Sequence, residues 1–473
     1  MAGFSKKDEQ YRQYALTASP VKVIMSACMP LALYQVLQSV FKIFDALLAS
    51  HIGAEAVSAV SCLSQITLMI TALGSGLAIG GSIKISEAYG RGDDVMVRQR
   101  LATVYAMAVL VSLVVAGTLI PFAPAFLRLL KTPEDLIAAG VGYFRVEILT
   151  LVVTFFNTVY IAIERSRGHA KKILNLNLVI ILVKLGLSAI FVFVMHGGLV
   201  LIAMATLISQ LLILFYALLT MPKDEGAFRF SPQNIRMKKD TVAPLLNLAY
   251  PVSAEKMLFA AGKVIVNSMS GVYGALTVGA LGISNNIGGL TTSWHMGFTD
   301  GGAPLISQNR GAGNYRRTLQ MYFWLLGIDI IIGVVGLILV STTLPWLAGI
   351  FAQSESNFDA GFRDMIVDIH RWEMLGYITL GINSATLALL LGYGYTKLTM
   401  ILNVSRVFVF RVPVLWFLQE FTKMDAEAVG VTMMVSNVCT GLLAIVLVIP
   451  VIRHIRKLIR EEESNQELQT SNL

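Results

Sequence analysis

A glycine-rich segment occurs twice in this chain, first as GLAIGGSIKISEAYGRG at residues 76–92 and again as GFTDGGAPLISQNRGAG at residues 297–313. A shift of 221 residues brings the two copies into register without a gap, and the register extends back to Pro30, which coincides with Pro251. Apolar helices match one another by chance at Leu and Ala, but not at a proline and a series of glycines. The chain therefore contains an internal repeat.

Glycines four residues apart, such as Gly76 with Gly80 and Gly297 with Gly301, mark each copy of this repeat. Such pairs let neighbouring helix backbones approach closely. We expect these glycines to serve helix packing rather than substrate recognition.

The composition indicates a membrane protein. Apolar residues make up 55% of the 473 residues and charged residues 14%, against about 25% charged in an average soluble domain. The mean hydropathy is +0.69, which one soluble core does not accommodate. We predict an all-α polytopic membrane protein of about twelve transmembrane helices, since about 20 apolar residues cross a bilayer. The expected spans are Val21–Ser50, Ala56–Ile85, Leu101–Leu127, Leu136–Ile163, Ile173–Met195, Leu199–Met221, Val242–Ser270, Leu276–Ile306, Leu319–Phe351, Trp372–Tyr393, Leu398–Phe421 and Ala428–Ile452.

Six spans in each repeat mean that both halves enter the membrane from the same side. The halves are then related by a pseudo-twofold axis along the membrane normal and are not inverted. We expect a tail at 1–20, a six-helix bundle at 21–221, a linker at 222–243, a second bundle at 244–455 and a tail at 456–473.

The distribution of Lys and Arg predicts the orientation. The N-terminus, the even-numbered loops and the C-terminus together carry 25 basic residues, whereas the opposite loops carry five: Arg128, Lys131, Arg363, Arg371 and Lys423. Cytosolic loops are enriched in Lys and Arg, so both termini are expected in the cytosol of a multi-pass protein of the plasma or inner membrane. This bias also explains the net charge of +8 without a nucleic-acid partner.

The chain lacks the common motifs for nucleotide binding, hydrolysis and metal binding, namely GxxxxGK[ST], HExxH, GxSxG and paired CxxC. Its cysteines, Cys28, Cys62 and Cys439, are far apart inside apolar runs, so they suit neither a disulfide framework nor a metal site. We therefore expect no catalytic residues, no metal and no cofactor. A membrane-embedded enzyme and a channel are the weaker readings from other classes.

Ionisable residues at membrane depth are the candidate functional residues, because each costs at least about 2.5–3.5 kcal/mol at a helix centre. In the first span, Gln35, Gln38, Lys42 and Asp45 follow helical spacing and share one face. In its repeat partner, Lys256, Lys263 and Asn267 share a face beside Glu255. Other spans add Lys184, His295, Asp300, Arg406 and Arg411. We expect these stripes to line a central substrate cleft, and we interpret His295 as a packed core residue and Arg145, Glu147 and Glu164 as residues of helix ends.

These residues resemble the multidrug and toxic compound extrusion (MATE) family, over Pro30 to about Ile452. The resemblance rests on Pro30, Asp45, Gly53, the loop Tyr89–Asp93 with its echo Asn309–Asn314, and the loop Arg165–Lys172. It implies two six-helix bundles that alternate between inward- and outward-open states and expel organic solutes against entry of protons or sodium ions. It also implies that Asp45 is the carboxylate that carries the coupling proton.

Several positions depart from the family pattern. Lys42 stands where an asparagine is common, Lys184 and Ser188 replace an asparagine–aspartate pair, and the tenth span offers only Asn383 and Ser384 at mid-depth. The deep groups are mostly basic, so we expect a cleft that favours anionic or zwitterionic solutes. A flippase for a lipid-linked precursor, from the same superfamily, is the alternative function, because its cleft also needs Lys and Arg for phosphate.

Overall fold

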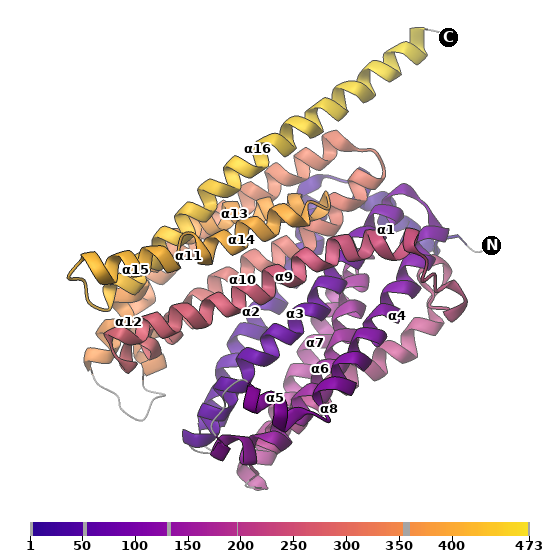
Figure 1. Cartoon of the computed structure of the whole chain (residues 1–473). Helices are drawn as coiled ribbons and strands as arrows, with labels where there is room; N and C mark the ends of the chain where they lie inside the picture. Colours follow the sequence, from indigo (N-terminus) through magenta and orange to yellow (C-terminus); the bar gives the residue numbers. More distant parts are fainter. Residues whose placement is uncertain (1–2, 51–53, 130–133, 196, 353–359, 472–473) are drawn as a thin grey trace. The chain divides into compact units, whose positions relative to one another are not determined.

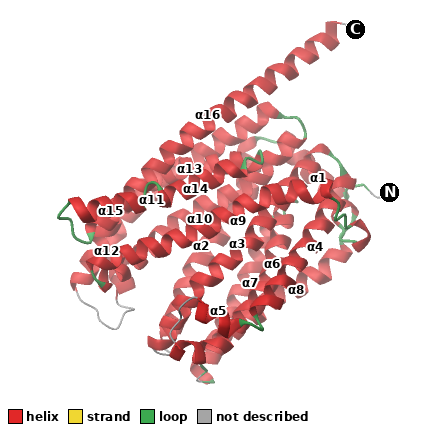
Figure 2. Ribbon diagram, in the orientation of Figure 1, coloured by secondary structure: helices red, strands yellow, loops and turns green. Residues whose placement is uncertain are grey.

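The computed structural model describes residues 3–50, 54–129, 134–195, 197–352 and 360–471. Throughout these ranges the chain forms helices joined by short loops, and no strand occurs in them (Figure 2). The predicted all-α class is therefore confirmed. Within a bilayer this outcome is dictated by the backbone, whose N–H and C=O groups find no water there and are satisfied inside a helix.

The N-terminal part of the chain contains eight α-helices among the described residues (Figure 1). They are α1 (Lys6–Thr17), α2 (Pro20–Ser50), α3 (Ala54–Arg91), α4 (Asp94–Leu119), α5 (Ala123–Leu129), α6 (Glu134–Ser166), α7 (Ala170–Ala189) and α8 (Leu199–Thr220). A π-helical turn, Ile190–Val194, extends α7. The connection to the C-terminal part contains three 3₁₀ turns, Met221–Lys223, Gly226–Phe228 and Pro232–Asn234.

The C-terminal part continues with eight further α-helices. They are α9 (Lys239–Ser270), α10 (Ala275–Gly311), α11 (Tyr315–Ala352), α12 (Ala360–Glu373), α13 (Tyr377–Gly392), α14 (Thr396–Phe408), α15 (Val412–Phe421) and α16 (Glu427–Ser471). Two 3₁₀ turns lie between them, Gly271–Tyr273 before α10 and Met374–Gly376 between α12 and α13.

The helices follow the predicted spans closely. Ten helical segments of the described residues are long and apolar enough to cross a membrane. The predicted spans Val242–Ser270 and Leu276–Ile306 correspond to α9 and α10, which are long enough, at 32 and 37 residues, but more polar. The fold of about twelve transmembrane helices predicted from hydropathy is therefore retained.

Two boundaries differ from the prediction by more than ten residues. The tenth span was expected to begin at Trp372, but α12 begins at Ala360, because its buried residues Phe362, Ile366 and Ile369 lie one helical turn apart among polar ones. The last span was expected to end at Ile452, but α16 continues to Ser471 as one helix (Figure 1).

The chain divides into two compact units. The first comprises residues 1–6, 37–85 and 94–261, and the second comprises residues 7–36, 86–93 and 262–473. The first unit has a core around Phe144, Ile148 and Phe155. The second has a core around Phe298 and Leu389, with further apolar residues from α2, α11 and α16. The two six-helix bundles at 21–221 and 244–455 stay a prediction.

The repeated glycines make the close helix contacts that their spacing predicts. In the first unit, Gly80 of α3 packs against Leu245 and Ala249 of α9, and a Cβ at Gly80 would lie 3.0 Å from the Ala249 nitrogen. In the second unit, Gly301 of α10 packs against Cys28 of α2, where a Cβ would lie 3.0 Å from the Cys28 Cα. The 221-residue shift relates the two contacts, because it maps Cys28 onto Ala249 and Gly80 onto Gly301.

A second reciprocal contact lies at the ends of α3 and α10. A Cβ at Gly90 would overlap the backbone carbonyl of Gln308, and a Cβ at Gly311 would overlap that of Glu87. The same shift maps Glu87 onto Gln308 and Gly90 onto Gly311. Both helix ends therefore touch backbone to backbone, which only glycine permits.

Candidate substrate and ion sites

The residues expected to carry ion coupling belong to α2. Lys42 and Asp45 fall within Pro20–Ser50, but their side chains lie outside the described residues. Their pairing and their role stay predictions.

Four predicted cleft residues belong to the first unit: Gln38, Lys184, Glu255 and Lys256. All four side chains are half-buried. Lys184 on α7 interacts electrostatically with Glu147 on α6. Glu147 had been interpreted as a helix-end residue, but it lies well inside α6, so this interpretation is wrong.

In the second unit, two predicted residues meet. Gln35 of α2 donates a hydrogen bond from Nε2 to Oδ2 of Asp300 on α10, at 3.0 Å. The amide of Gln35 is therefore one observed partner of Asp300. Lys263 and Asn267, both on α9, are exposed.

The two deep arginines converge on neighbouring residues of α16. Arg406 lies in α14, and Arg411 lies in the turn between α14 and α15, directly before Val412. Nη2 of Arg406 donates to Oδ1 of Asn437 at 2.7 Å. Nε of Arg411 donates to Oγ of Ser436 at 3.2 Å. The sequence placed both arginines in a cleft without indicating these partners.

A buried hydrogen-bond chain lies beside these arginines. Oγ of Ser284 donates to Oε2 of Glu373 at 2.6 Å, and Nδ1 of His370 lies 2.8 Å from the same Oγ. Nε2 of His370 lies 2.8 Å from the hydroxyl of Tyr377. Because the Ser284 hydrogen is used on Glu373, a neutral His370 with its proton on Nδ1 satisfies every link.

Sequence reasoning missed this chain. The prediction placed Gln353–Arg371 outside the membrane and considered only Asn383 and Ser384 in the tenth span. His370 and Glu373 instead close α12 at the 3₁₀ turn before α13. The 3.6-residue spacing of apolar residues in α12 was the signal that could have found them.

A second missed carboxylate pairs with His295. Nδ1 of His295 on α10 lies 2.8 Å from Oδ1 of Asp329 on α11, and both side chains are buried. Among the described residues, Nε2 of His295 has no hydrogen-bond partner. The expectation that His295 is a packed residue is confirmed, but its partner is an ionisable group inside an apolar span.

Glu164 is the centre of an ion network at the end of α6, although the sequence assigned it no role. Its carboxylate oxygens lie 3.1 Å from Nη1 of Arg167, 2.7 Å from Nδ1 of His169 and 3.0 Å from Nζ of Lys172. Arg167 also binds Asp224, at 2.9 Å. Burial raises the pKa of the Asp224 carboxyl above its ordinary value, and Arg167 opposes that shift. The network joins α6, α7 and the connection after α8.

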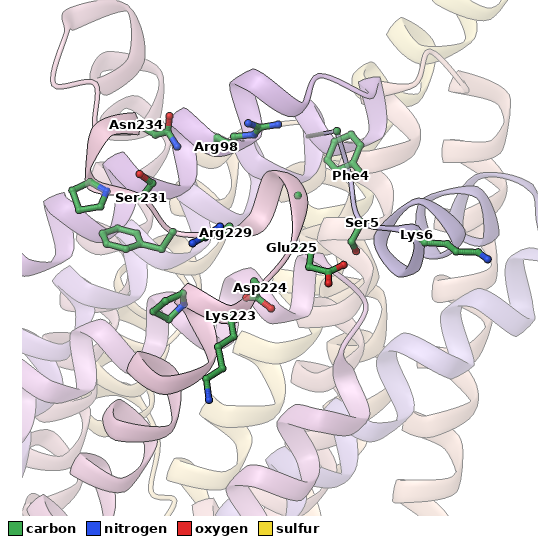
Figure 3. A pocket seen from close by; sticks show the side chains of 15 residues that line it. Phe4, Ser5, Lys6, Arg98, Lys223, Asp224, Glu225, Arg229, Ser231 and Asn234 are labelled. Atoms are coloured by element: carbon green, nitrogen blue, oxygen red, sulfur yellow. The ribbon is translucent and has the colours of Figure 1, made fainter. Parts of the chain in front are cut away.

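The same connection holds the start of the chain (Figure 3). Gly226 has a positive φ of +68°, and a Cβ there would lie 2.5 Å from the carbonyl oxygen of Gly3. The rings of Phe4 and Phe228 lie 6.3 Å apart. The adjoining pocket is lined by both acidic and basic residues, including Asp224, Glu225, Lys6, Lys223, Arg98 and Arg229. Such a mixed lining does not select a substrate of one charge.

Comparison with known proteins identifies the fold. The MatE family model matches residues 30–190 and 251–417, two segments whose starts are 221 residues apart. The chain is 23% identical over 410 residues to the probable multidrug resistance protein YoeA of Bacillus subtilis, covering 85% of this chain and 88% of that protein.

Solved structures share the fold over nearly the whole chain. A crystal structure of MATE in complex with MaL6 superposes with a TM-score of 0.90 at 18% identity, covering 96% of this chain and all of that one. A MOP superfamily transporter from Pyrococcus furiosus, described as having a binding pocket of reverse polarity that suggests a different function, superposes with a TM-score of 0.88 at 19% identity, covering 96% and 99%.

Proposed function

The chain belongs to the MatE family, and on that premise we propose that it is a secondary active multidrug efflux transporter of the cell membrane. It exports small organic solutes by alternating access, coupled to entry of a cation. The observation that carries the proposal is the match of one family model to both halves of the chain at the repeat distance. The multidrug resistance name of its Bacillus subtilis relative agrees with it.

The coupling ion in this proposal is the proton, carried by Asp45. A carboxylate that lines an alternating cleft can bind a proton on one side of the membrane and release it on the other. Lys42 lies one helical turn away in the sequence, where it can pair with Asp45. We propose that Lys42 and proton occupancy compete for the Asp45 carboxylate, with both termini in the cytosol as the Lys and Arg distribution predicts.

The preferred substrate in this proposal is an organic anion or zwitterion. Lys184, Lys256 and Lys263 supply positive charge at the predicted cleft, together with Arg406 and Arg411. Glu255 and Asp300 are the acidic residues predicted at the same cleft, and Asp300 already accepts a hydrogen bond from Gln35. Lys184 lies near Glu147 and Arg411 near Glu373, so the positive charge in this proposal rests mainly on Lys256, Lys263 and Arg406. A relative of the same fold described with a reverse-polarity pocket supports such a departure.

The flippase alternative is the weaker candidate. The family model that matches is MatE, and the Bacillus subtilis relative carries a multidrug resistance name. A phosphate-binding cleft remains compatible with basic residues, but no observation on the described residues favours a lipid-linked substrate over a soluble one.

Transport by the purified protein in liposomes tests the proposal. Liposomes with a proton gradient, and others with a sodium gradient, are loaded with fluorescein as the anionic probe or ethidium as the cationic probe. We expect proton-driven movement of fluorescein, its loss in Asp45→Asn, and a shifted pH profile in Lys42→Asn. Glu461→Gln, which alters an exposed residue of α16, is the control. Movement of ethidium alone would contradict the substrate class, and flux independent of both gradients would contradict antiport.

A further inference from the structure

Two buried donor groups of the second unit have no hydrogen-bond partner among the described residues. We propose that Arg411 and Asn437, with Arg406 beside them, form an anion-binding site inside the second unit. The site takes one compact anionic group, such as a carboxylate, a phosphate or a halide ion. The proposal names a binding site and its ligand chemistry, and its binding test does not depend on the transport function proposed above.

Arg411 is the first observation. Its side chain is 2% exposed, and the hydrogen bond that it makes is the one from Nε to Ser436. Among the described residues, Nη2 of Arg411 has no hydrogen-bond partner. No carboxylate of those residues lies within the 4.0 Å ion-pair distance of its guanidinium. An arginine stays charged in a protein interior, so this site holds a positive charge without a counter-ion in contact.

Asn437 is the second observation, and it follows Ser436 directly on α16. Asn437 is 0% exposed, and its Oδ1 is occupied by Arg406. That bond fixes the orientation of the amide, because a guanidinium donates to oxygen and not to an NH₂ group. Nδ2 is therefore a donor, and it has no partner among the described residues. Both unsatisfied groups are donors, which is the pattern that an anion satisfies.

Glu373 does not fill this role. Arg411 interacts with it electrostatically, but its carboxylate already accepts from Ser284 at 2.6 Å and lies 3.6 Å from Nδ1 of His370. With Arg406 and Arg411 both charged, the one carboxylate of Glu373 leaves the cluster with a net positive charge. A second anion would balance it.

The physical chemistry favours a small anionic group. An unpaired charge taken out of water carries a large desolvation cost, which an ion in direct contact offsets. Guanidinium groups bind carboxylate and phosphate with charge-assisted hydrogen bonds, which are shorter and stronger than neutral ones. An amide N–H from Asn437 adds a directional neutral donor. Two sources share this chemistry: the anionic group of an exported solute, which rests on the proposed function, and a free inorganic anion.

Thermal unfolding of the purified full-length protein in detergent tests the site. The reference buffer contains gluconate as its anion, and a zwitterionic buffer without added salt shows whether this carboxylate binds as well. The probes are chloride, phosphate and benzoate, added as sodium salts against sodium gluconate. A ligand that binds only the folded state raises the unfolding midpoint as its concentration increases. We expect at least one probe to do so in the native protein, and Arg411→Gln to weaken its apparent affinity about tenfold or more. Arg363→Gln, at an exposed arginine of α12, is the matched control and should respond as the native protein does.

Asn437→Asp gives an independent arm. It places a carboxylate beside Arg406 and Arg411, as a built-in substitute for the anion. We expect a higher midpoint than that of the native protein in gluconate, and loss of the response to the probes. A lower midpoint with the response retained contradicts the proposal.

The probes also separate the two sources. Stabilisation by chloride or phosphate, with benzoate ineffective, assigns the site to an inorganic anion, whereas stabilisation by benzoate assigns it to the carboxylate of an organic solute. Equal responses of the native protein and Arg411→Gln overturn the proposal. So does the absence of any response, which would mean that the cluster is a closed structural network. None of these readings needs a gradient or a flux, so failure of the site is distinguishable from failure of the transport function.

Discussion

Replacing His295 by leucine tests the buried pair between α10 and α11. The change removes the partner that lies 2.8 Å from Asp329, in a place where the carboxylate is 0% exposed. Removing the neighbour of a buried carboxylate costs about 3–5 kcal/mol, because the negative charge then stays buried without compensation. The carboxyl can instead take up a proton, which at pH 7 costs about 4 kcal/mol for a group whose ordinary pKa is near 3.9. The destabilisation caused by the buried charge therefore does not exceed about 4 kcal/mol. We therefore expect a loss of about 3–4 kcal/mol of unfolding free energy at pH 7.

A double variant tests whether the buried negative charge causes this loss of unfolding free energy. In His295→Leu with Asp329→Asn, the buried group is a neutral amide, whose unmet hydrogen bonds cost about 1–3 kcal/mol. The second change should therefore restore about 1–2 kcal/mol that the first one removed. Denaturant unfolding in mixed micelles measures both variants, and His454→Leu, at an exposed histidine of α16, should stay within about 0.5 kcal/mol of the native protein. If Asp329→Asn destabilises the His295→Leu variant further, the buried-charge reasoning is refuted.

Three further changes test other contacts, each by thermal unfolding midpoint and yield of folded protein. Gly90→Val should prevent stable folding or lower the unfolding free energy by more than about 3 kcal/mol, because the new side chain would overlap the Gln308 carbonyl. Its control, Gly117→Val, has open space around it and should cost about 1 kcal/mol or less. Equal effects of the two changes would contradict the close helix contact at Gly90. Glu164→Gln should cost about 3 kcal/mol, because it weakens the contacts to Arg167, His169 and Lys172 at a buried position. A loss below about 0.5 kcal/mol would show that solvent screens the network. Gly226→Ala should lower the unfolding free energy more than Gly313→Ala does. Both glycines have a positive φ, but a Cβ at Gly226 would also overlap the backbone of Gly3, whereas one at Gly313 would meet open space. The reverse order would argue against packing of the N-terminal residues on Gly226.

The fold was predictable from the sequence because the bilayer imposes it. The apolar runs are long enough to cross a bilayer. Together with the alternation of basic loops and the repeated glycines, they predicted helices near the positions where the structure has them. The start of the tenth span was missed because α12 is amphipathic. Its buried face carries Phe362, Ile366 and Ile369. Exposed residues such as Arg363 and Asp364 lower the mean hydropathy of the segment. Average hydropathy cancels over such a helix, while its 3.6-residue period does not.

The site was less predictable, because a sequence reveals which residues are charged but not which atoms they meet. The list of deep groups included Arg406 and Arg411, yet their partners on α16, Asn437 and Ser436, are polar residues that the sequence does not distinguish from other polar positions. Asp329 was overlooked although an ionisable residue in an apolar span is itself a functional signal. Its partner His295 lies on another helix, and the spacing of residues along one helix does not predict contacts between two helices.

The two halves share packing more strictly than they share charge. Where the repeat is in register, glycines that bring backbones together occur in both copies, as in the reciprocal contacts of Gly90 and Gly311. The ionisable position His295 has Gly74 as its counterpart, and Asp300 has Ile79. Helix packing is a steric demand that both copies meet, since the repeated glycines admit a neighbouring helix backbone in each. Binding an ion or an anionic group is needed only once per molecule, so the charged residues are free to differ between the halves. This asymmetry is why the repeat predicts the scaffold and leaves the site to be found from contacts.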